Sequence, residues 1–403
     1  MQFLTQNQSN PCKVITWHDK ENTGAIGWIV ISNLNNKISG GGLFMDSSAS
    51  LAETIDLAHT MRLKNALQRP AFGGGKGGIK FDPNHPEAKA VLQRFLHDNI
   101  DIISKEWCTG GDINTTTSDI TDLLRKISHL ESPFHCLADM LKTEMDYEIN
   151  FDRFNHYLSC RDNTFFKIEE AITGFGVSKA IAHQINIKKR KPKIIVQGFG
   201  KIGKALCFYA HQFADIVGIC EQNWFIYQPQ GIPIEKLLDC GIDFESLHAF
   251  NPVMRGNAES NEDFLIRFLN QTKADLFCPC ATRYAITENV LNSLIVHTFS
   301  DAEGYIISGA NNVFSQMALI DIAFNNNIVV IPEWLSNVGA AILYMEALKY
   351  QASGNEWIDF IKNQVANRIN EFLEKAHAVS KDNNMNIYLA CIQLAENSIN
   401  GEI

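Results

Sequence analysis

The sequence predicts an α/β protein of two domains, in which apolar strands alternate with helices. Three observations support this prediction. The chain has 403 residues, which is more than one typical hydrophobic core accommodates. Its residues are 45% hydrophobic and 20% charged, as in an ordinary globular protein. Short apolar runs recur with helical stretches between them, an alternation typical of a parallel, doubly wound sheet.

Residues 1–165 are expected to form an N-terminal α/β domain. The elements expected in it are a strand at 26–32 and helices at 51–67, 88–103 and 118–127. Residues 130–164 are polar and show no clear period, so the sequence assigns them no structure beyond an interdomain region or insertion.

Residues 166–340 are expected to form a second domain, and residues 341–403 a helical segment. A helix beginning near 173–180 leads to a solvated basic turn at 188–191. Apolar strands are then expected at 194–196, 216–220, 276–278, 305–308 and 328–331.

The strongest motif of the chain lies at the start of this second domain. An apolar strand runs into Gly198-Phe199-Gly200-Lys201-Ile202-Gly203, and a helical stretch follows. In such a turn the first glycine permits the tight bend, the second admits a pyrophosphate against the backbone, and the third lets helix and strand pack closely. The context of strand, glycines and helix therefore predicts a Rossmann-type dinucleotide-binding domain.

The next apolar strand ends at an acidic residue, Glu221, eighteen residues after Gly203. An acid at this place binds the ribose 2′-hydroxyl of NAD, whereas the 2′-phosphate of NADP would meet a negative charge. The sequence therefore predicts NAD as the cofactor.

A second site is indicated by Lys76, which lies in a run with five glycines between Phe72 and Ile79. Glycines permit close approach of the backbone and positive φ angles, so the lysine is expected on tight backbone and partly removed from water. Burial disfavours the charged form of lysine, as a general base requires. The alternatives are a solvated lysine on a glycine-rich loop and a phosphate-binding loop. The latter needs Ser or Thr directly after the lysine, where this chain has Gly77.

Two further polar residues fit a pocket around Lys76. Lys64 lies upstream in an expected helix, where it could bind an anion, and Asp112 lies in the run Thr109-Gly-Gly-Asp-Ile-Asn-Thr115. A carboxylate beside a lysine tunes it and can relay its protons. The alternative is that Asp112 belongs to an ordinary turn.

Charge and composition exclude several other classes of protein. The formal net charge of −10 argues against a nucleic-acid partner. The first residues lack the features of a secretory signal, and no apolar run is long enough to span a bilayer. The ten cysteines are therefore expected to be reduced thiols of a cytoplasmic protein, and no residue pattern indicates a metal site.

The order of these motifs resembles the dehydrogenases of glutamate, leucine, phenylalanine and valine over roughly residues 37–350. The resemblance is closest to the leucine and phenylalanine members. The matching motifs are Gly40-Gly-Gly-Leu43, Lys64, Gly74-Gly-Lys-Gly-Gly78, Asp112 with Asn114 and Thr115, Thr173-Gly-Phe-Gly-Val177, the Gly198–Gly203 fingerprint with Glu221, Pro279-Cys-Ala-Thr282, Gly309-Ala-Asn-Asn312 and Ile331–Gly339.

The resemblance implies reversible, NAD-dependent oxidative deamination of an L-amino acid to a 2-oxo acid and ammonia. It implies Lys64 as the lysine that binds the substrate α-carboxylate, Lys76 as the catalytic base and Asp112 as its proton-shuttling partner. It places Thr173, Ala281, Asn311 and Asn312 at the cofactor. It also implies that the C-terminal helices return to the first domain, and that this domain builds a homo-oligomer, a dimer or higher.

The departures from the family pattern concern the substrate. Leu43 follows the glycines where the family usually has Arg nearby, and Asn337-Val-Gly-Ala340 replaces the usual Asn-Ala-Gly-Gly. Members that use glutamate carry a lysine just before the Gly-Gly pair, and if Gly41-Gly42 is that pair, the equivalent here is Gly40. Glycine at position 40 has no charge that could pair with a substrate carboxylate, and it leaves space. Gly110 is likewise expected to leave space in the pocket. The expected substrate is therefore an apolar amino acid, branched or aromatic. The alternatives are a glutamate dehydrogenase-type activity and a catalytically silent NAD-binding relative.

Overall fold

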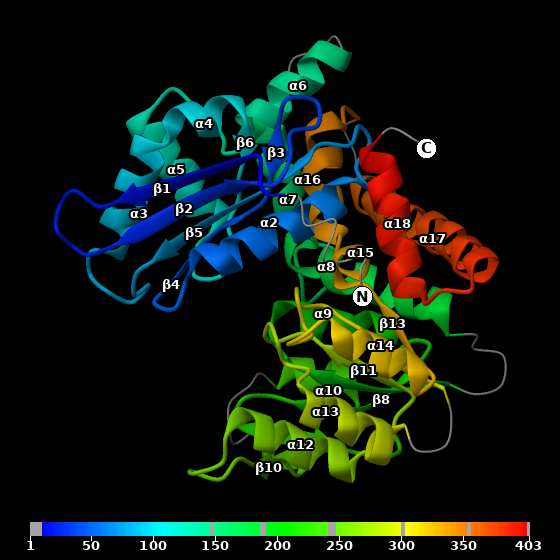
Figure 1. The fold of residues 1–403 in the computed structure, drawn as a ribbon. Coiled ribbons are helices and arrows are strands. Elements are labelled where there is room, and N and C mark those ends of the chain that lie inside the picture. Colours follow the sequence, from blue (N-terminus) through cyan, green and yellow to red (C-terminus); the bar gives the residue numbers. More distant parts are fainter. Residues whose placement is uncertain are drawn as a thin grey trace. The chain divides into compact units, whose positions relative to one another are not determined.

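In the computed structural model of the protein, the chain forms two compact α/β units, which confirms the expected fold class (Figure 1). The structure describes residues 10–145, 149–185, 191–240, 247–299, 303–352 and 356–400. The first unit contains residues 1–155, 345–351 and 395–403, and the second contains residues 156–344 and 352–394.

The first unit is built on a mixed sheet of six strands. They are β1 (Lys13–His18), β2 (Ile26–Ile31), β3 (Ser39–Gly40), β4 (Leu43–Asp46), β5 (Gly73–Lys80) and β6 (Trp107–Cys108). Their order is β1-β2-β5-β3-β6, and β4 also pairs with β5. The strand β5 is therefore central, and it pairs antiparallel with β2 and parallel with β3 and β4.

Helices pack on this sheet. The helices of the first unit are α2 (Leu51–Asn65), α3 (Ala88–Asp98), α4 (Ile100–Lys105), α5 (Thr117–Ile127) and α6 (His135–Met145), and α7 (Phe151–Ser159) continues from the first unit into residues grouped with the second. The first begins where the hydroxyl of Ser50 accepts a hydrogen bond from the backbone of Glu53, and α5 begins in the same way at Thr116.

Two expectations about these helices differ from the structure. The single helix expected at 88–103 is two helices, because the side-chain amide of Asn99 donates to the carbonyl of Phe95 and competes with the helical pattern there. Residues 130–164, which had no assigned structure, contain α6 and α7. Both helices bury apolar side chains such as Leu141 and Phe154.

The second unit is built on a seven-stranded sheet, in which the five consecutive strands from β8 to β13 are parallel. The strands are β7 (Lys193–Gln197), β8 (Asp215–Cys220), β9 (Trp224–Tyr227), β10 (Val253–Met254), β11 (Leu276–Pro279), β12 (Gly304–Ile307) and β13 (Ile328–Ile331). Their order is β10-β9-β8-β7-β11-β12-β13, with β9 and β10 antiparallel to their neighbours. All five expected strands of this unit are present.

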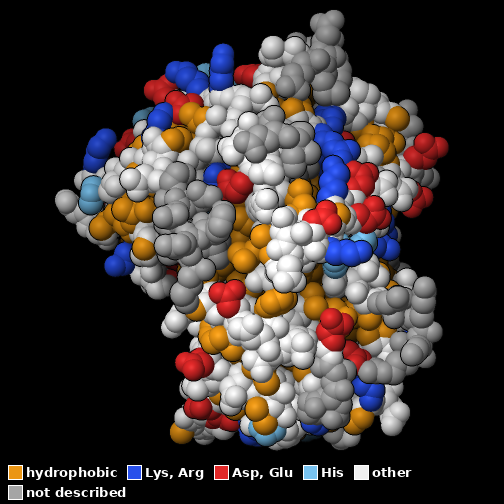
Figure 2. All heavy atoms as spheres, turned by 45° about the vertical axis from the view of Figure 1, so that its right-hand side comes forward, with side chains coloured by type: hydrophobic (Ala, Val, Ile, Leu, Met, Phe, Trp, Pro, Cys, Tyr) orange, Lys and Arg blue, Asp and Glu red, His pale blue; other side chains and the backbone are white. Residues whose placement is uncertain are grey.

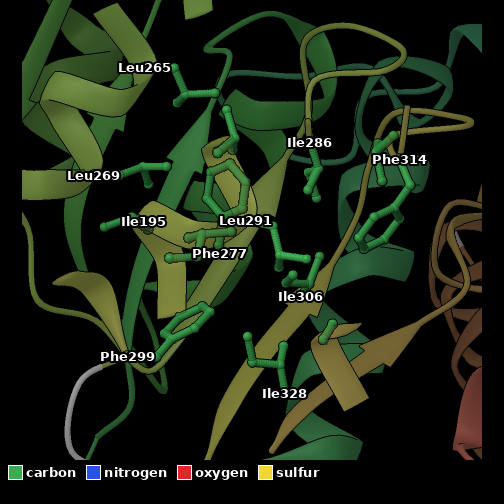
Figure 3. Close-up of a cluster of buried hydrophobic side chains, with 14 of the residues drawn as sticks. Ile195, Leu265, Leu269, Phe277, Ile286, Leu291, Phe299, Ile306, Phe314 and Ile328 are labelled. Carbon is green, nitrogen blue, oxygen red and sulfur yellow. The ribbon is translucent and has the colours of Figure 1, made fainter. Parts of the chain in front are cut away.

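The helices of the second unit include α8 (Ile168–Gln184), α9 (Lys201–Ala210), α10 (Ile234–Asp239), α12 (Asn261–Gln271), α13 (Glu288–Ser293), α14 (Ala318–Asn325) and α15 (Glu333–Ser336). Side chains from α12, α13 and the sheet form one apolar core, which includes Leu265, Leu291 and Phe277 of β11 (Figure 3). This core holds β7 and β11, and therefore the loops that follow them, in place.

The C-terminal helices are α16 (Gly339–Lys349), α17 (Trp357–Asn383) and α18 (Ile387–Ile399). We expected residues 341–403 to return to the first domain as one segment. The structure differs, because α17 packs against α8 of the second unit, and only residues 345–351 and 395–403 are grouped with the first.

On the face drawn in Figure 2, acidic and basic side chains occur side by side.

No helix among the described residues has the length and apolar character needed to cross a membrane. The expected basic turn at 188–191 lies outside the described residues, except for Lys191.

Candidate active site

Lys76 lies in the middle of β5, and its side chain is buried, with 3% of the residue exposed. The expectation of positive φ angles in the glycine run is wrong, because the run is an extended strand. The described glycines with positive φ are Gly24, Gly198 and Gly231. The glycines flanking Lys76 instead allow other groups to approach the strand closely.

The groups that approach β5 lie on both of its faces. A Cβ atom at Gly75 or Gly77 would lie 2.8 or 2.6 Å from the indole of Trp107. On the other face, a Cβ atom at Gly74 would lie 2.2 Å from the backbone nitrogen of Arg62 in α2. The strand is therefore held between the indole and the helix, and Lys76 is its one long side chain in this stretch.

Lys76 forms an ion pair with Asp112, donating from Nζ to Oδ2. The other carboxylate oxygen, Oδ1, accepts a hydrogen bond of 2.8 Å from the backbone nitrogen of Ile113. The backbone nitrogen of Asp112 donates to the hydroxyl of Thr115 at 3.0 Å. These contacts fix the carboxylate, and 27% of its side chain is exposed, so it connects a buried amine with solvent.

Lys64 lies in the last turn of α2 and is 7% exposed. This helix packs along β5, so the structure places Lys64 and Lys76 in the same unit on directly packed elements. Gly41 and Gly42 also lie beside β5 and Asp112. A Cβ atom at Gly41 would lie 1.9 Å from the carbonyl oxygen of Gly75, and one at Gly42 would lie 3.1 Å from Cβ of Asp112.

The expectation that Gly40 leaves open space is wrong. A Cβ atom at Gly40 would lie 2.6 Å from Sγ of Cys108 and 2.6 Å from the ring of Phe72. Contact with Cys108 and burial raise the pKa of the neighbouring thiol of Cys136, which keeps that thiol neutral. The surroundings of Gly40 are thus an aromatic ring and a thiol.

Gly110 has more space around it than Gly40. A Cβ atom there would lie 3.3 Å from the ring of Phe134 and 3.5 Å from the hydroxyl of Thr117. Its carbonyl oxygen accepts a hydrogen bond from Leu43, which joins this segment to β4. A role for Gly110 in substrate size remains a prediction.

Trp107 is a residue of this site that no sequence motif indicates. Its indole is fully buried, covers Gly75 and Gly77, and donates from Nε1 to the carbonyl of Gly41 at 3.2 Å. A tryptophan thirty residues after the glycines has no local pattern that connects it with them, so the sequence alone could not reveal this contact.

In the second unit, the three glycines after β7 differ in their surroundings as the fingerprint requires. Gly198 has a φ of +94°, which forms the sharp bend. A Cβ atom at Gly203 would lie 2.0 Å from the carbonyl oxygen of Gly198, so only glycine lets α9 pack here. A Cβ atom at Gly200 meets no described atom within 4 Å, so the space above this residue is open at the N-terminus of α9. The neighbouring fingerprint residues Phe199, Lys201 and Ile202 lie in the bend and at the start of α9.

Glu221 follows β8 and lies against this bend. Its Oε1 accepts a hydrogen bond from the backbone nitrogen of Phe199, and its Oε2 accepts one of 3.1 Å from Gln222. The carboxylate is therefore held beside the fingerprint, at the edge where a ribose would lie.

Other expected cofactor residues gather at the carboxyl ends of β7, β11 and β12. A Cβ atom at Gly198 would lie 2.7 Å from Cβ of Ala281. The side chain of Asn337 donates to the carbonyl of Gly309 at 3.1 Å and to Oδ1 of Asn311 at 2.8 Å. In the sequence, Asn337 stands out only as part of the motif Ile331–Gly339. Its contacts with Gly309 and Asn311 make it a further candidate for the cofactor site.

Two expected residues are held on neighbouring elements. The backbone nitrogen of Asn312 donates to Glu333 at 3.0 Å. Thr173 lies on α8, where a Cβ atom at Gly339 would lie 3.1 Å from its Cα. Burial raises the pKa of Cys280, which follows β11, to about 12, which favours the neutral thiol.

One unit with this glycine fingerprint and another that holds a buried lysine paired with a carboxylate are typical of a nicotinamide-dependent dehydrogenase. The model of the Glutamate/Leucine/Phenylalanine/Valine dehydrogenase family matches residues 166–400, and the model described as Glu/Leu/Phe/Val dehydrogenase, dimerisation domain, matches residues 11–129. The chain belongs to this family of amino-acid dehydrogenases.

Three similar proteins illustrate the relationship. The glutamate dehydrogenase of Thermotoga maritima is 23% identical over 384 residues, which cover 92% of this chain and 83% of the relative. The NADP-specific glutamate dehydrogenase of Saccharolobus shibatae is 24% identical over 319 residues, covering 78% and 69%. The structure of L-tryptophan dehydrogenase from Nostoc punctiforme has a TM-score of 0.58 at 19% identity and covers 100% of this chain and 99% of that chain.

Proposed function

We propose that the protein catalyses the reversible oxidative deamination of an apolar L-amino acid to a 2-oxo acid and ammonia, with NAD as cofactor. The observation that carries this proposal is the ion pair between Lys76 and Asp112 on the packed glycine strand. A buried amine whose partner carboxylate reaches solvent can take up and release protons repeatedly.

Each residue of the first unit has a role in this reaction. Lys64 binds the substrate α-carboxylate, and the backbone of Gly40, Gly41 and Gly42 lies along the substrate. NAD, when bound, would supply the acceptor for the hydride of the substrate Cα, and loss of this hydride and of a proton from the amino group converts the substrate to an imine. Lys76 then removes a proton from the water that attacks the imine carbon, and Asp112 passes this proton to solvent.

The residues of the second unit fit NAD. The bend Gly198–Gly203 and the open space at Gly200 suit a pyrophosphate, and Thr173, Ala281, Asn311 and Asn312 suit the nicotinamide and its ribose. Glu221 supports NAD over NADP, because its carboxylate accepts a hydrogen bond from a ribose hydroxyl and repels a phosphate.

We therefore expect kcat/KM with NAD to exceed that with NADP by about tenfold or more, a difference of about 1.4 kcal/mol or more. In Glu221→Ser the preference should fall, because the repelling charge is removed. Steady-state rates with both cofactors measure this, and the melting temperature checks that the loss of the bond to Phe199 leaves the fold intact. Equal efficiencies in the wild type would contradict the role of Glu221.

The proposal of an apolar substrate is supported by the surroundings of Gly40. The side chains nearest to this position are Phe72 and Cys108, neither of which can pair with a substrate carboxylate. The tryptophan dehydrogenase of Nostoc punctiforme supports a large apolar side chain. The named glutamate dehydrogenases equally support the alternative, that glutamate is the substrate.

A comparison of amino acids decides between these substrates. We expect kcat/KM for at least one of leucine, valine, phenylalanine and tryptophan to exceed that for glutamate by about a hundredfold or more, which is about 2.7 kcal/mol, since an unpaired carboxylate in an apolar site costs more than a neutral polar group there. If glutamate is the best substrate, the assignment of Gly40 to the side-chain pocket is wrong.

We also propose a homo-oligomer built through the first unit, supported by the match of residues 11–129 to a dimerisation domain.

A further inference from the structure

Asn65 is the last residue of α2 and directly follows Lys64. It is buried, with 1% exposed, and its side-chain nitrogen donates two hydrogen bonds. One goes to the carbonyl oxygen of Gly40 at 3.0 Å and the other to that of Gly73 at 2.8 Å. Both hydrogens of the amide are thus used on backbone carbonyls.

The two carbonyls belong to different strands. Gly40 lies in β3, and Gly73 is the first residue of β5, three residues before Lys76. These strands pair in parallel. The side-chain amide of Asn65 therefore joins the end of α2 to β3, which contains Gly40, and to β5, which contains Lys76.

The orientation of this amide is determined by its acceptors, because an oxygen facing two carbonyls would repel both. The amide oxygen, Oδ1, is buried and has no hydrogen-bond partner among the described residues. An unsatisfied buried acceptor costs free energy. An apolar residue would avoid this cost, so the contribution of Asn65 lies in the two hydrogen bonds that its nitrogen donates.

We propose that Asn65 is a positioning residue that fixes the direction of Lys64 relative to Lys76. Successive residues of a helix differ in direction by a fixed rotation, so holding Asn65 against β3 and β5 also sets the direction of Lys64. The consequence for catalysis rests on the proposed function, in which Lys64 binds the substrate carboxylate and Lys76 acts on the reacting carbon.

The test compares Asn65→Ala with a matched control, Asn99→Ala. Asn99 is also a buried asparagine of the first unit, 7% exposed, whose side-chain nitrogen donates to the carbonyl of Phe95 at 2.8 Å. Both variants lose a buried amide and should lose comparable thermal stability. Asn65→Ala should raise KM for the amino acid about tenfold or more, the size expected for two lost hydrogen bonds, with a smaller change in kcat. In Asn99→Ala, KM should stay within about twofold of wild type, since its lost bond joins Asn99 only to Phe95 at the end of α3.

A second readout does not depend on turnover. The reaction of Lys64 with acetic anhydride, followed by mass spectrometry, is compared with that of Lys105, whose side chain is 71% exposed. Lys64 should be protected in the wild type and in Asn99→Ala, and should react faster in Asn65→Ala. Unchanged KM and unchanged protection of Lys64 in Asn65→Ala would overturn the proposal, as would equal effects in both variants. A wild type without turnover would contradict the proposed function alone, and the labelling would still decide the role of Asn65.

Discussion

Lys76→Ala is expected to reduce kcat by about 10²-fold or more, because the reaction then lacks its positioned general base. The binding of NADH should survive, since the fingerprint Gly198–Gly203 belongs to the second unit. Steady-state rates and a fluorescence titration with NADH measure the two effects separately.

The control for this variant is Lys80→Ala. Lys80 lies at the end of the same strand, β5, and is exposed. It should keep wild-type kcat. Retention of more than about a tenth of wild-type kcat in Lys76→Ala would show that another group acts as the base.

A pair of glycine variants is expected to separate folding from cofactor binding. In Gly203→Ala the new Cβ atom would meet the carbonyl oxygen of Gly198 at 2.0 Å, so stability should fall by about 1–3 kcal/mol. In Gly200→Ala the Cβ atom meets no described atom within 4 Å and φ is −78°, which alanine adopts readily. This variant should keep its stability and bind NADH about tenfold more weakly or worse, because the pyrophosphate needs that space.

Thermal unfolding and NADH titration of both variants provide the comparison. If Gly200→Ala binds NADH as the wild type does, the pyrophosphate does not lie against this part of the backbone. If Gly203→Ala is as stable as the wild type, α9 has room to shift away from the bend.

The dinucleotide-binding half could be predicted because its signals are local. The three glycines Gly198, Gly200 and Gly203 lie within six residues. The flanking strand and helix define the role of each one, namely the bend, the approach of the pyrophosphate and the packing of the helix. Glu221 was found by the same logic, since the end of the next parallel strand must lie beside the bend.

The glycine run around Lys76 shows why the rest could not be predicted. Its composition indicates close approach of the backbone but not what approaches, so positive φ angles were expected where the chain is an extended strand. The groups responsible are Trp107, which is distant in sequence, and α2, which precedes the strand, and both meet the glycines only in the folded sheet. The space at Gly40 was misjudged for the same reason, because Phe72 and Cys108 fill it.

The measurement that tests the central claim most directly is the yield of products from the purified protein with NAD at alkaline pH and single L-amino acids. The account predicts that at least one apolar amino acid gives NADH and ammonia in equal amounts, together with its 2-oxo acid. If NADH binds but no amino acid, glutamate included, releases ammonia, the protein is a silent relative and the proposed activity is wrong.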